Sequence, residues 1–450
     1  MKPCWPLVLL LALPGLAAAQ SQNCDLAGSR QLYSVSGGAV IYVGNPVFNC
    51  DNGSRILADS AIILQESGRA DFLGNVRFSD AERSLTAAQA QYLPRERRVM
   101  AQQNVVLSNK QDGSRLTASS LDYFQPSALY PEGRIDVHTG RPRGTIIRRR
   151  PNAPAPDTTI IDADRMQIVG EHIFRGWGNV RTRRGEMTSV SQYAEFNEQT
   201  NRMRLTGQAV VQSDTFQLRA DSIDALVENG DQFRELHAHR NVILESEGVD
   251  LTAPIVRLYF TKGEAETLIA LGGARVGANQ PQARAVSPDF VLIADSIDAF
   301  SPQQKLERVF AVGKARGERF ADTATARTLP EAIRNDWVQG DTVRAYFTER
   351  PPTAPAAGQP PRPATAARAD STRVLERVLA LGSPASSTYR LQEESGDTVE
   401  ISVNYLTAKK LDVTFKEGAV HRVLAEGEIR GLYLQPPARA QATGAPVRQP

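Results

Sequence analysis

Apolar and polar positions alternate along this chain in short units that recur roughly every 30 residues, with Asn75 and Asn104 29 positions apart. One unit has an apolar residue, any residue, Ala, two variable positions, an apolar residue, any residue, and an apolar or aromatic residue. Its copies are ILADSAII (56–63), LTAAQAQY (85–92), LTASSLDY (116–123), IDADRMQI (161–168), LRADSIDA (218–225), LTAPIVRL (251–258) and LIADSIDA (292–299). A second unit lies between these copies, with Gly or a polar residue, often Asn, and then alternating apolar positions, as in GNVRF (74–78), QNVVL (103–107) and GNVRT (178–182). Such repetition indicates one supersecondary structure used many times.

The units predict β-strands rather than helices. Their apolar residues alternate with a period of two, and they are rich in Val, Ile, Thr and Tyr. Turn sequences separate them, namely DNGS (51–54), QDGS (111–114), ENGD (228–231) and ESGD (394–397). The stretch with the most helical character is TLPEAIRNDW (328–337). We therefore predict an all-β fold, elongated and built from repeated antiparallel hairpins.

The spacing within the first unit also predicts a bend. Its apolar residues occupy positions 1, 3, 6 and 8, so a flat strand would send the first two to one face and the last two to the other. A β-bulge or sharp bend at positions 4 and 5 would return all four to one side. Stacked bent hairpins would then share an apolar interior that no single unit could bury alone.

Eight residues at these positions are predicted to face that interior. They are Ile56, Ala58, Leu85, Leu116, Leu218, Ile223, Leu251 and Ile297. Ala at the third position would keep the narrow end of the interior open. Two interpretations remain for these residues: they line a space that takes up an apolar ligand, or they only fill the protein's own core.

The N-terminus predicts an exported protein. The stretch MKPCWPLVLLLALPGLAAAQ has one Lys, a short apolar run and three Ala, which is typical of a cleavable signal peptide. The expected organisation is a signal peptide (1–19), a first β module (20–147), a second β module (158–348), a Pro/Ala-rich spacer (349–370), a C-terminal β repeat segment (371–434) and a disordered tail (435–450). The break RRRPNAPAPD (148–157) either separates two modules or forms a long loop inside one sheet.

Cysteine and charge narrow the choice of function further. Cys4 leaves with the signal peptide, so Cys24 and Cys50 are expected to form a disulfide in an oxidising compartment. Removing Lys2 from the 52 basic residues leaves 51 against 50 acidic ones, so no bulk charge would attract nucleic acid. The segment 134–150 carries six Arg and is either a patch for phosphate groups or a solvated hairpin, and the second interpretation is favoured.

The candidates for catalysis and metal binding are few. His237 and His239 lie on one side of a predicted strand near Glu235, but an exposed strand face explains them better than a zinc site. The sequence has no G-x-S-x-G, HExxH, P-loop or CxxC motif. The repeated Asp59, Asp164, Asp221 and Asp295 occupy equivalent bends, whereas a glycosidase needs one asymmetric pair of carboxylates. We therefore expect no enzymatic activity, no metal and no cofactor.

The alternation of GNVRF with L-x-A-D-x-x-x-Y units behind a signal peptide resembles the OstA-like family, which includes the LptA-type periplasmic lipopolysaccharide-transport proteins. The resemblance covers most of residues 32–300, with fainter copies in 301–347 and 372–434. It implies a β-jellyroll bent into a V-shaped trough that holds the acyl chains of lipid A. It also implies a periplasmic location, and partners that are inner- and outer-membrane lipid-export components joined by strand-edge pairing, with head-to-tail self-association. This chain departs from the commonest member of the family in being more than twice as long and in having the spacer.

The sequence thus predicts a periplasmic lipid-binding or lipid-transfer protein that carries lipopolysaccharide or a related amphiphile towards the outer membrane. The alternative is an exported structural or adhesive β-solenoid that binds protein or polysaccharide without lipid. A polysaccharide hydrolase on a repeat scaffold is a third and weaker alternative.

Overall fold

The computed structural model describes residues 24–35, 39–148, 156–170, 172–228, 232–246, 248–320, 334–349, 373–395, 398–416 and 419–434. In these residues the chain forms β-strands, the short 3-10 helices η2 (Pro94–Glu96), η3 (Gly273–Arg275) and η4 (Pro302–Gln304), and no α-helix. The all-β fold predicted from the sequence is confirmed. Across the described ranges, we find no helix with the length and apolar character needed to cross a bilayer.

The chain divides into two compact units, an N-terminal unit (Met1–Gly185) and a C-terminal unit (Glu186–Pro450). The strands of the N-terminal unit are β1 (Cys24–Gly28), β2 (Gln31–Val35), β3 (Val40–Gly44), β4 (Val47–Cys50), β5 (Arg55–Leu57), β6 (Ser60–Leu64), β7 (Arg69–Ser79), β8 (Arg83–Leu93), β9 (Arg98–Asn109), β10 (Arg115–Phe124), β11 (Arg134–Val137), β12 (Arg143–Arg148), β13 (Asp157–Asp162), β14 (Arg165–Val169) and β15 (Ile173–Arg184).

The strands of the C-terminal unit are β16 (Met187–Asn197), β17 (Arg202–Gln212), β18 (Phe216–Glu228), β19 (Gln232–Ser246), β20 (Val249–Thr261), β21 (Glu264–Leu271), β22 (Ala283–Val286), β23 (Phe290–Ala294), β24 (Ser296–Phe300), β25 (Arg308–Arg319), β26 (Asp336–Glu349), β27 (Arg373–Ser395), β28 (Thr398–Lys416), β29 (Ala419–Glu426) and β30 (Arg430–Leu434). The predicted turns DNGS and QDGS fall between consecutive strands, β4 and β5 for the first and β9 and β10 for the second. The turns ENGD and ESGD lie partly outside the described residues.

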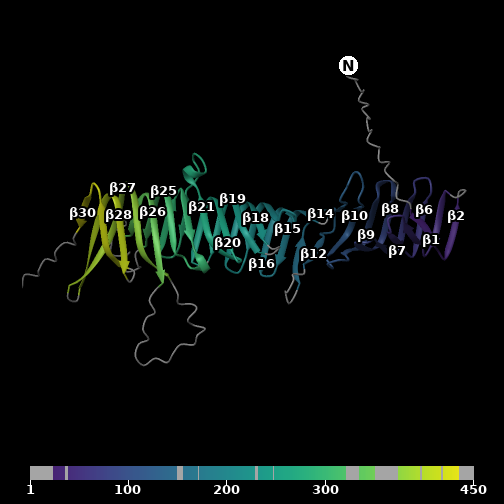
Figure 1. Cartoon of the computed structure of the whole chain (residues 1–450), viewed down its shortest axis with the longest axis horizontal. Helices are drawn as coiled ribbons and strands as arrows, with labels where there is room; N and C mark the ends of the chain where they lie inside the picture. The colour runs from purple at the N-terminus through teal and green to yellow at the C-terminus, as the bar shows by residue number, and fades with distance from the viewer. Residues whose placement is uncertain are drawn as a thin grey trace, which may run out of the picture. The chain divides into compact units, whose positions relative to one another are not determined.

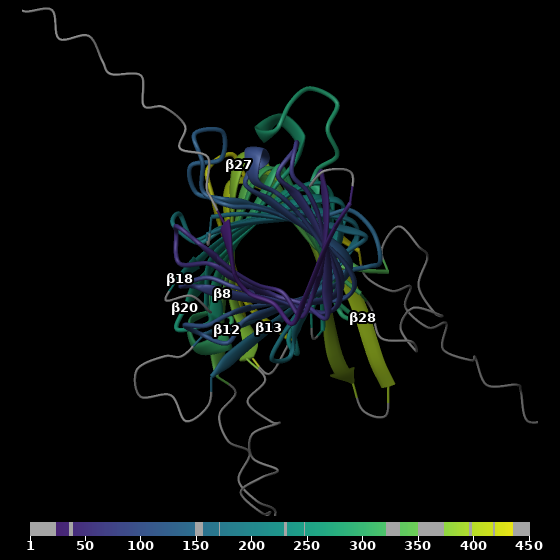
Figure 2. The same cartoon turned by 90° about the vertical axis from the view of Figure 1, so that its right-hand side faces the viewer.

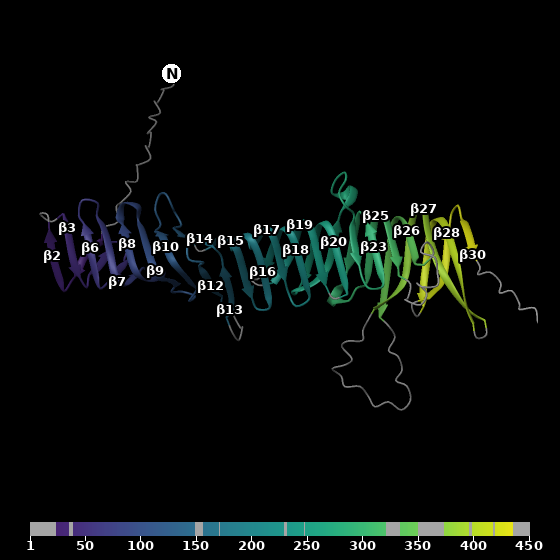
Figure 3. The same cartoon turned by 180° about the vertical axis from the view of Figure 1, so that it is seen from behind.

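Within each unit, antiparallel neighbours build the sheet (Figures 1 and 3). Some long strands face two short ones: β7 pairs with β5 at one end and with β6 at the other. Strand β15 pairs in this way with β13 and β14, and β25 with β23 and β24. The short strands are therefore two halves of one strand that is interrupted where it bends.

The bends coincide with the second repeated unit of the sequence. Gly74 and Asn75 both adopt left-handed backbone, with φ of 75° and 46°, and the β7–β8 register shifts between Leu73 and Val76. The same pairing of consecutive left-handed residues occurs at Gly178–Asn179, Gly207–Gln208, Arg240–Asn241 and Gly313–Lys314. Such a bulge bends the strand and changes which side chains face inward.

The bend brings all four apolar positions of a unit to one side. In β8, Leu85, Ala87, Ala90 and Tyr92 are 0%, 7%, 7% and 4% exposed, and the β8–β9 register shifts between Thr86 and Gln89. The corresponding residues of β18, Leu218, Ala220, Ile223 and Ala225, are buried as well. The bend predicted at positions 4 and 5 is confirmed in these copies. Seen along its length in Figure 2, the N-terminal unit, in purple and blue, has bent strands arranged around a common axis.

The repeated Asp at position 4 stabilises the bend. Asn75 donates Nδ2 to Oδ2 of Asp59 at 2.8 Å, and Asn179 donates to Asp164 at 2.9 Å. Asp221 accepts in the same way from Asn241, and Asp295 from Gln282. Since each carboxylate accepts from a side chain at or beside a left-handed bend, these residues act at the bends as the sequence predicted.

The sequence break at 148–157 lies inside the N-terminal unit. Strands β12 and β13 pair across it, with Arg148 opposite Asp157. The segment therefore connects two paired strands of one sheet, which is the second of the two interpretations given above. The compact units divide later, between Gly185 and Glu186.

The helix predicted over 328–337 is wrong at its C-terminal end. Asp336 and Trp337 begin β26, and Trp337 pairs with Glu318 of β25. Pairing along the edge of β25 outweighs the local helical propensity of these residues. Residues 328–333 lie outside the described residues, as do the predicted signal peptide, residues 350–370 of the spacer and the tail 435–450.

Candidate functional site: the apolar interior

The predicted interior residues lie on the inward faces of the strands. In the N-terminal unit, Ile56, Leu85 and Leu116 are buried on β5, β8 and β10. Ala58 is half-buried in the interruption between β5 and β6, so it belongs to the bend and not to a strand. In the C-terminal unit, the four residues Leu218, Ile223, Leu251 and Ile297 are between 0% and 3% exposed. Whether they bind lipid stays a prediction.

The two interiors differ in the side chains that fill them. Among the largest fully buried side chains of the N-terminal unit are Phe72 and Phe78, and the Phe72 ring packs edge-on against Phe48 at 5.5 Å. Those of the C-terminal unit include Leu205, Leu218, Ile223, Leu236 and Leu411. The N-terminal interior is thus rich in rings, while large aliphatic side chains dominate the C-terminal one.

The interior residues are packed against the protein's own atoms. Side chains that are 0–4% exposed, such as Leu85 and Leu218, leave almost no surface for a ligand in this state. An alkyl chain could reach them only if facing parts of the wall moved apart. Its binding free energy would depend on how far packing against the lipid compensates for the disrupted packing of the protein.

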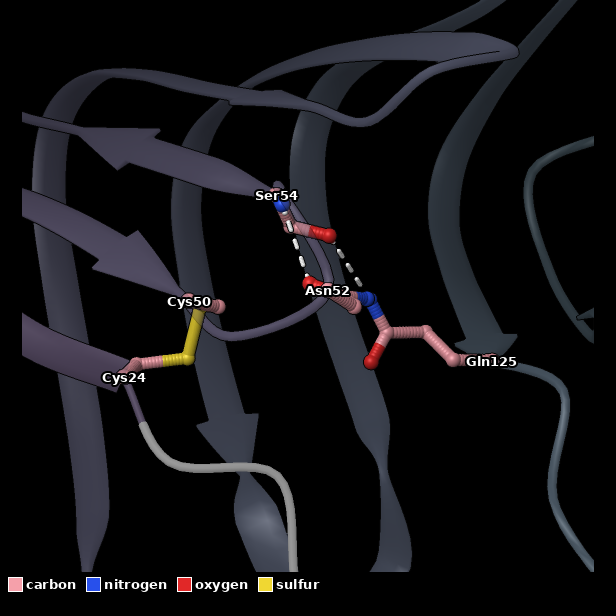
Figure 4. Close-up of a disulfide and its surroundings, with 5 residues drawn as sticks. All are labelled: Cys24, Cys50, Asn52, Ser54 and Gln125. Carbon is pink, nitrogen blue, oxygen red and sulfur yellow. Dashed lines mark hydrogen bonds between the residues drawn. A yellow bond between two sulfur atoms is a disulfide. The ribbon is translucent and has the colours of Figure 1, made fainter.

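A disulfide and a buried polar pair lie at the N-terminal end of the first interior (Figure 4). Cys24 of β1 and Cys50 of β4 are directly opposite each other in the ladder and form the disulfide. Four residues beyond Cys50, Ser54 is buried and accepts a hydrogen bond from Gln125 at 3.4 Å. Oε1 of Gln125 is buried and accepts no hydrogen bond from the described residues.

An outward pocket of about 460 Å³ lies in the C-terminal unit. Its lining is Glu195, Asn197, Thr200, Arg202, Met203, Arg204, Asp224, Ala225, Leu226, Glu235 and His237. Arg204 and Asp224 form an ion pair at 2.7 Å across β17 and β18. Opposite charges pair inside this pocket, so it presents no single sign of charge to a ligand.

His237 contributes to this pocket from β19. Its Nε2 lies 3.4 Å from Oε2 of Glu235, and its ring packs edge-on against Tyr259. Burial lowers the pKa of His237 below its ordinary value, an effect that the nearby Glu235 carboxylate opposes. Within the described part of the chain, no group of three or more His, Cys, Asp or Glu is arranged to hold a metal ion.

Strands at the two ends of the chain carry exposed apolar side chains. All five residues of β30 are exposed, among them Leu432 and Leu434, and β30 pairs with β28. Near the other end, Tyr33 of β2 is 66% exposed and packs near Tyr42 of β3. Exposed strands of this kind can accept a further strand.

Sequence reasoning missed two kinds of residue. The left-handed pairs such as Gly74 and Asn75 are visible in the second repeated unit, but a Gly and an Asn before alternating apolar residues equally indicate the start of a strand. The buried polar residues Arg83, Ser54 and Gln125 follow no repeat, and their partners are distant in sequence. No local pattern could have identified them.

Comparison with protein-family models gives no match, and comparison with curated proteins gives none either. One similar solved structure is that of LptH from Pseudomonas aeruginosa, described as the LptA homologous periplasmic component of the conserved lipopolysaccharide transport device. It is 13% identical, the match covers 36% of this chain and 80% of that chain, and the TM-score is 0.15. A likeness with so low a TM-score carries no argument about this protein.

Proposed function

We propose that this protein binds the acyl chains of lipopolysaccharide or a related amphiphile in the periplasm and carries it towards the outer membrane. The observation that supports the proposal is the repeated bend, which gathers every apolar position of a unit, such as Leu218, Ala220, Ile223 and Ala225, onto one inward face. No reactive group is required, and we propose no enzymatic activity.

The apolar interior can supply the binding free energy. Transfer of about 12 methylenes from water to an apolar environment gains about 10 kcal/mol. Part of this gain is offset, because residues such as Leu218, which is completely buried, must lose packing against the protein's own atoms. The OstA-like resemblance implies a trough that opens along one side, and such a trough could part to admit an acyl chain.

Exposed strands suggest how the protein would join its partners. Tyr33 on β2 and Leu432 and Leu434 on β30 are exposed and apolar. Addition of a strand from another protein would satisfy the backbone groups of these edges and cover the apolar side chains. We propose that inner- and outer-membrane lipid-export components, or a second copy of this chain, bind there.

Native mass spectrometry of the protein purified from the periplasm tests the proposal. The wild type is expected to carry additional mass that dissociates as a lipid with acyl chains. Leu218→Asn places a polar group on the inward face and is expected to reduce the lipid-bound fraction at least severalfold, because it removes apolar area and adds an unpaired amide. The control Arg219→Asn changes the adjacent exposed residue and should leave that fraction unchanged. A wild-type protein free of lipid under native conditions would contradict the proposal.

The adhesive alternative is favoured by one observation, the nearly complete burial of the interior residues by the protein itself. If that core is permanently closed, the exterior alone is available to bind protein or polysaccharide. The same mass spectra separate the two functions, since an adhesive protein would be lipid-free in the wild type and in both variants.

A further inference from the structure

The strands of the N-terminal unit end on two lines, which we call lips. Antiparallel neighbours turn back at alternate ends, so lip 1 contains the connections 51–54, 80–82 and 110–114, and lip 2 contains the connections 65–68, 94–97 and 125–133 together with Gly170. Because each strand is bent over the interior, the two lips approach each other along a seam. Any movement that exposes the interior of this unit without breaking strand pairs must separate the lips.

A buried hydrogen bond joins the lips near the disulfide. Gln125 on lip 2 donates Nε2 to Oγ of Ser54 on lip 1 at 3.4 Å (Figure 4). The two residues are 71 positions apart and are 2% and 1% exposed. Ser54 is also fixed by its backbone N–H, which donates to Oδ1 of Asn52 at 2.9 Å. Ser54 is therefore held in position by a contact within lip 1, independently of Gln125.

Two further hydrogen bonds cross the seam. The hydroxyl of Tyr123, at the lip 2 end of β10, donates to Oδ2 of Asp80 on lip 1 at 3.1 Å. Arg83, at the lip 1 end of β8, donates Nη2 to the carbonyl oxygen of Gly170 on lip 2 at 3.2 Å. The guanidinium of Arg83 also lies 5.3 Å from the centre of the Tyr123 ring. Burial raises the pKa of Tyr123, so its hydroxyl keeps the donated proton at neutral pH.

A ring pair spans the corresponding region of the C-terminal unit. Phe216 begins β18 and Phe260 lies near the end of β20, so the two rings come from opposite ends of the strands. Their centroids are 6.3 Å apart, and both side chains are half-buried. Apolar rings can slide past an alkyl chain without losing a hydrogen bond, whereas the polar contacts of the N-terminal unit must break.

We propose that Ser54, Asp80, Arg83, Tyr123 and Gln125 form a polar latch that holds the N-terminal seam closed, and that this latch must open before an acyl chain reaches the interior of that unit. The inference rests on the proposed function. Leu85 and the other interior side chains are almost completely buried by the protein itself, so admission of a chain requires the lips to part. Opening the seam breaks three side-chain hydrogen bonds, whereas separating two neighbouring strands breaks a whole ladder of backbone hydrogen bonds, so parting the lips requires less free energy.

Uptake of the fluorescent fatty acid cis-parinaric acid by the full chain tests the latch, together with amide exchange at the lips. Tyr123→Phe removes the hydrogen bond to Asp80 and keeps the ring, and Gln125→Met removes the bond to Ser54. Each is expected to increase the initial uptake rate by about fivefold, the factor that corresponds to one net hydrogen bond, and to speed amide exchange at 80–83 and 125–133. The control Tyr193→Phe removes a phenol–carboxylate bond of 2.9 Å to Glu195, which lies two residues away on the same strand. It should match the wild type.

The outcomes separate the latch from the proposed function. If the wild type takes up the probe and neither Tyr123→Phe nor Gln125→Met is faster than Tyr193→Phe, the latch is wrong and the proposed function stands. If neither the wild type nor either latch variant takes up the probe, the proposed function fails and the gating role of the latch fails with it, whereas uptake by the two latch variants alone supports the latch. Faster uptake in both latch variants, with faster exchange at both lips, supports the inference.

Discussion

At the scale of single residues, the fold depends on where the backbone can adopt positive φ. Gly74 and Asn75 produce the bend between the two halves of β7, and the Asn75 side chain ties that bend to Asp59. Glycine is needed at the first of these positions for two separate reasons. Its φ is 75°, and a Cβ would overlap the carboxylate of Asp59.

Gly74→Ala is expected to destabilise the N-terminal unit by about 2–4 kcal/mol, because backbone strain and displacement of Asp59 add together. Gly53→Ala is the matched control: its φ is 79°, but no atom beyond its two chain neighbours lies within 4 Å of the added Cβ, so strain of about 1 kcal/mol remains. Urea denaturation followed by circular dichroism measures both free energies of unfolding. An equal decrease in the free energy of unfolding of the two variants would contradict the role assigned to the Asp59 contact.

The bends could be predicted from the sequence for a physical reason. Positions 1, 3, 6 and 8 cannot share a face on a flat strand, so burial of all four required a bend, and the structure has it at Leu85 to Tyr92. The latch residues were beyond such reasoning. Tyr123 and Asp80 are 43 positions apart and meet only across the seam, so their contact depends on how the whole sheet bends.

At the scale of strands, the N-terminal edge is stabilised covalently. β1 has five residues and pairs with β4, and the Cys24–Cys50 disulfide links the two strands at their first matched position. A loop of 26 residues is closed by this bond. By loop entropy, such a closure contributes about 3 kcal/mol to the stability of this edge.

The double variant Cys24→Ala, Cys50→Ala is expected to speed amide exchange in β1 and β4 by tenfold or more, because β1 then depends on its few backbone bonds to β4. Hydrogen exchange monitored by mass spectrometry measures this change peptide by peptide. Peptides from β18 and β19 in the C-terminal unit serve as the internal reference and should not change. Protection of β1 equal to that of the wild type would show that the disulfide adds nothing to this edge.

Strand positions were largely predictable from the local sequence, whereas the pairing of strands across irregular segments was not. Turn residues such as Asn52 and Gly53 require backbone shapes that end a strand, so DNGS and QDGS were found from local chemistry. The pairing of β12 with β13 across residues 148–157 depends on partner strands, and the Pro-rich sequence alone suggested a boundary. Trp337 joined a strand for the same reason.

At the scale of the whole molecule, the proposed function depends on the repetition of one bent unit along the chain. Each unit gathers apolar side chains on one inward face, with Leu116 in the N-terminal unit and Leu218 in the C-terminal unit as examples. The exposed neighbours Thr117 and Arg219 lie on the opposite face of the same strands. This alternation gives every inward position a control one residue away.

Photocrosslinking in cells tests the central claim most directly. A photoreactive amino acid replaces Leu116 or Leu218, with Thr117 or Arg219 replaced in the paired controls, and adducts are identified by mass spectrometry. We predict lipid adducts at Leu116 and Leu218 and few or none at Thr117 and Arg219. Lipid adducts confined to Thr117 and Arg219, or no lipid at any of the four positions, would contradict an apolar interior that carries acyl chains.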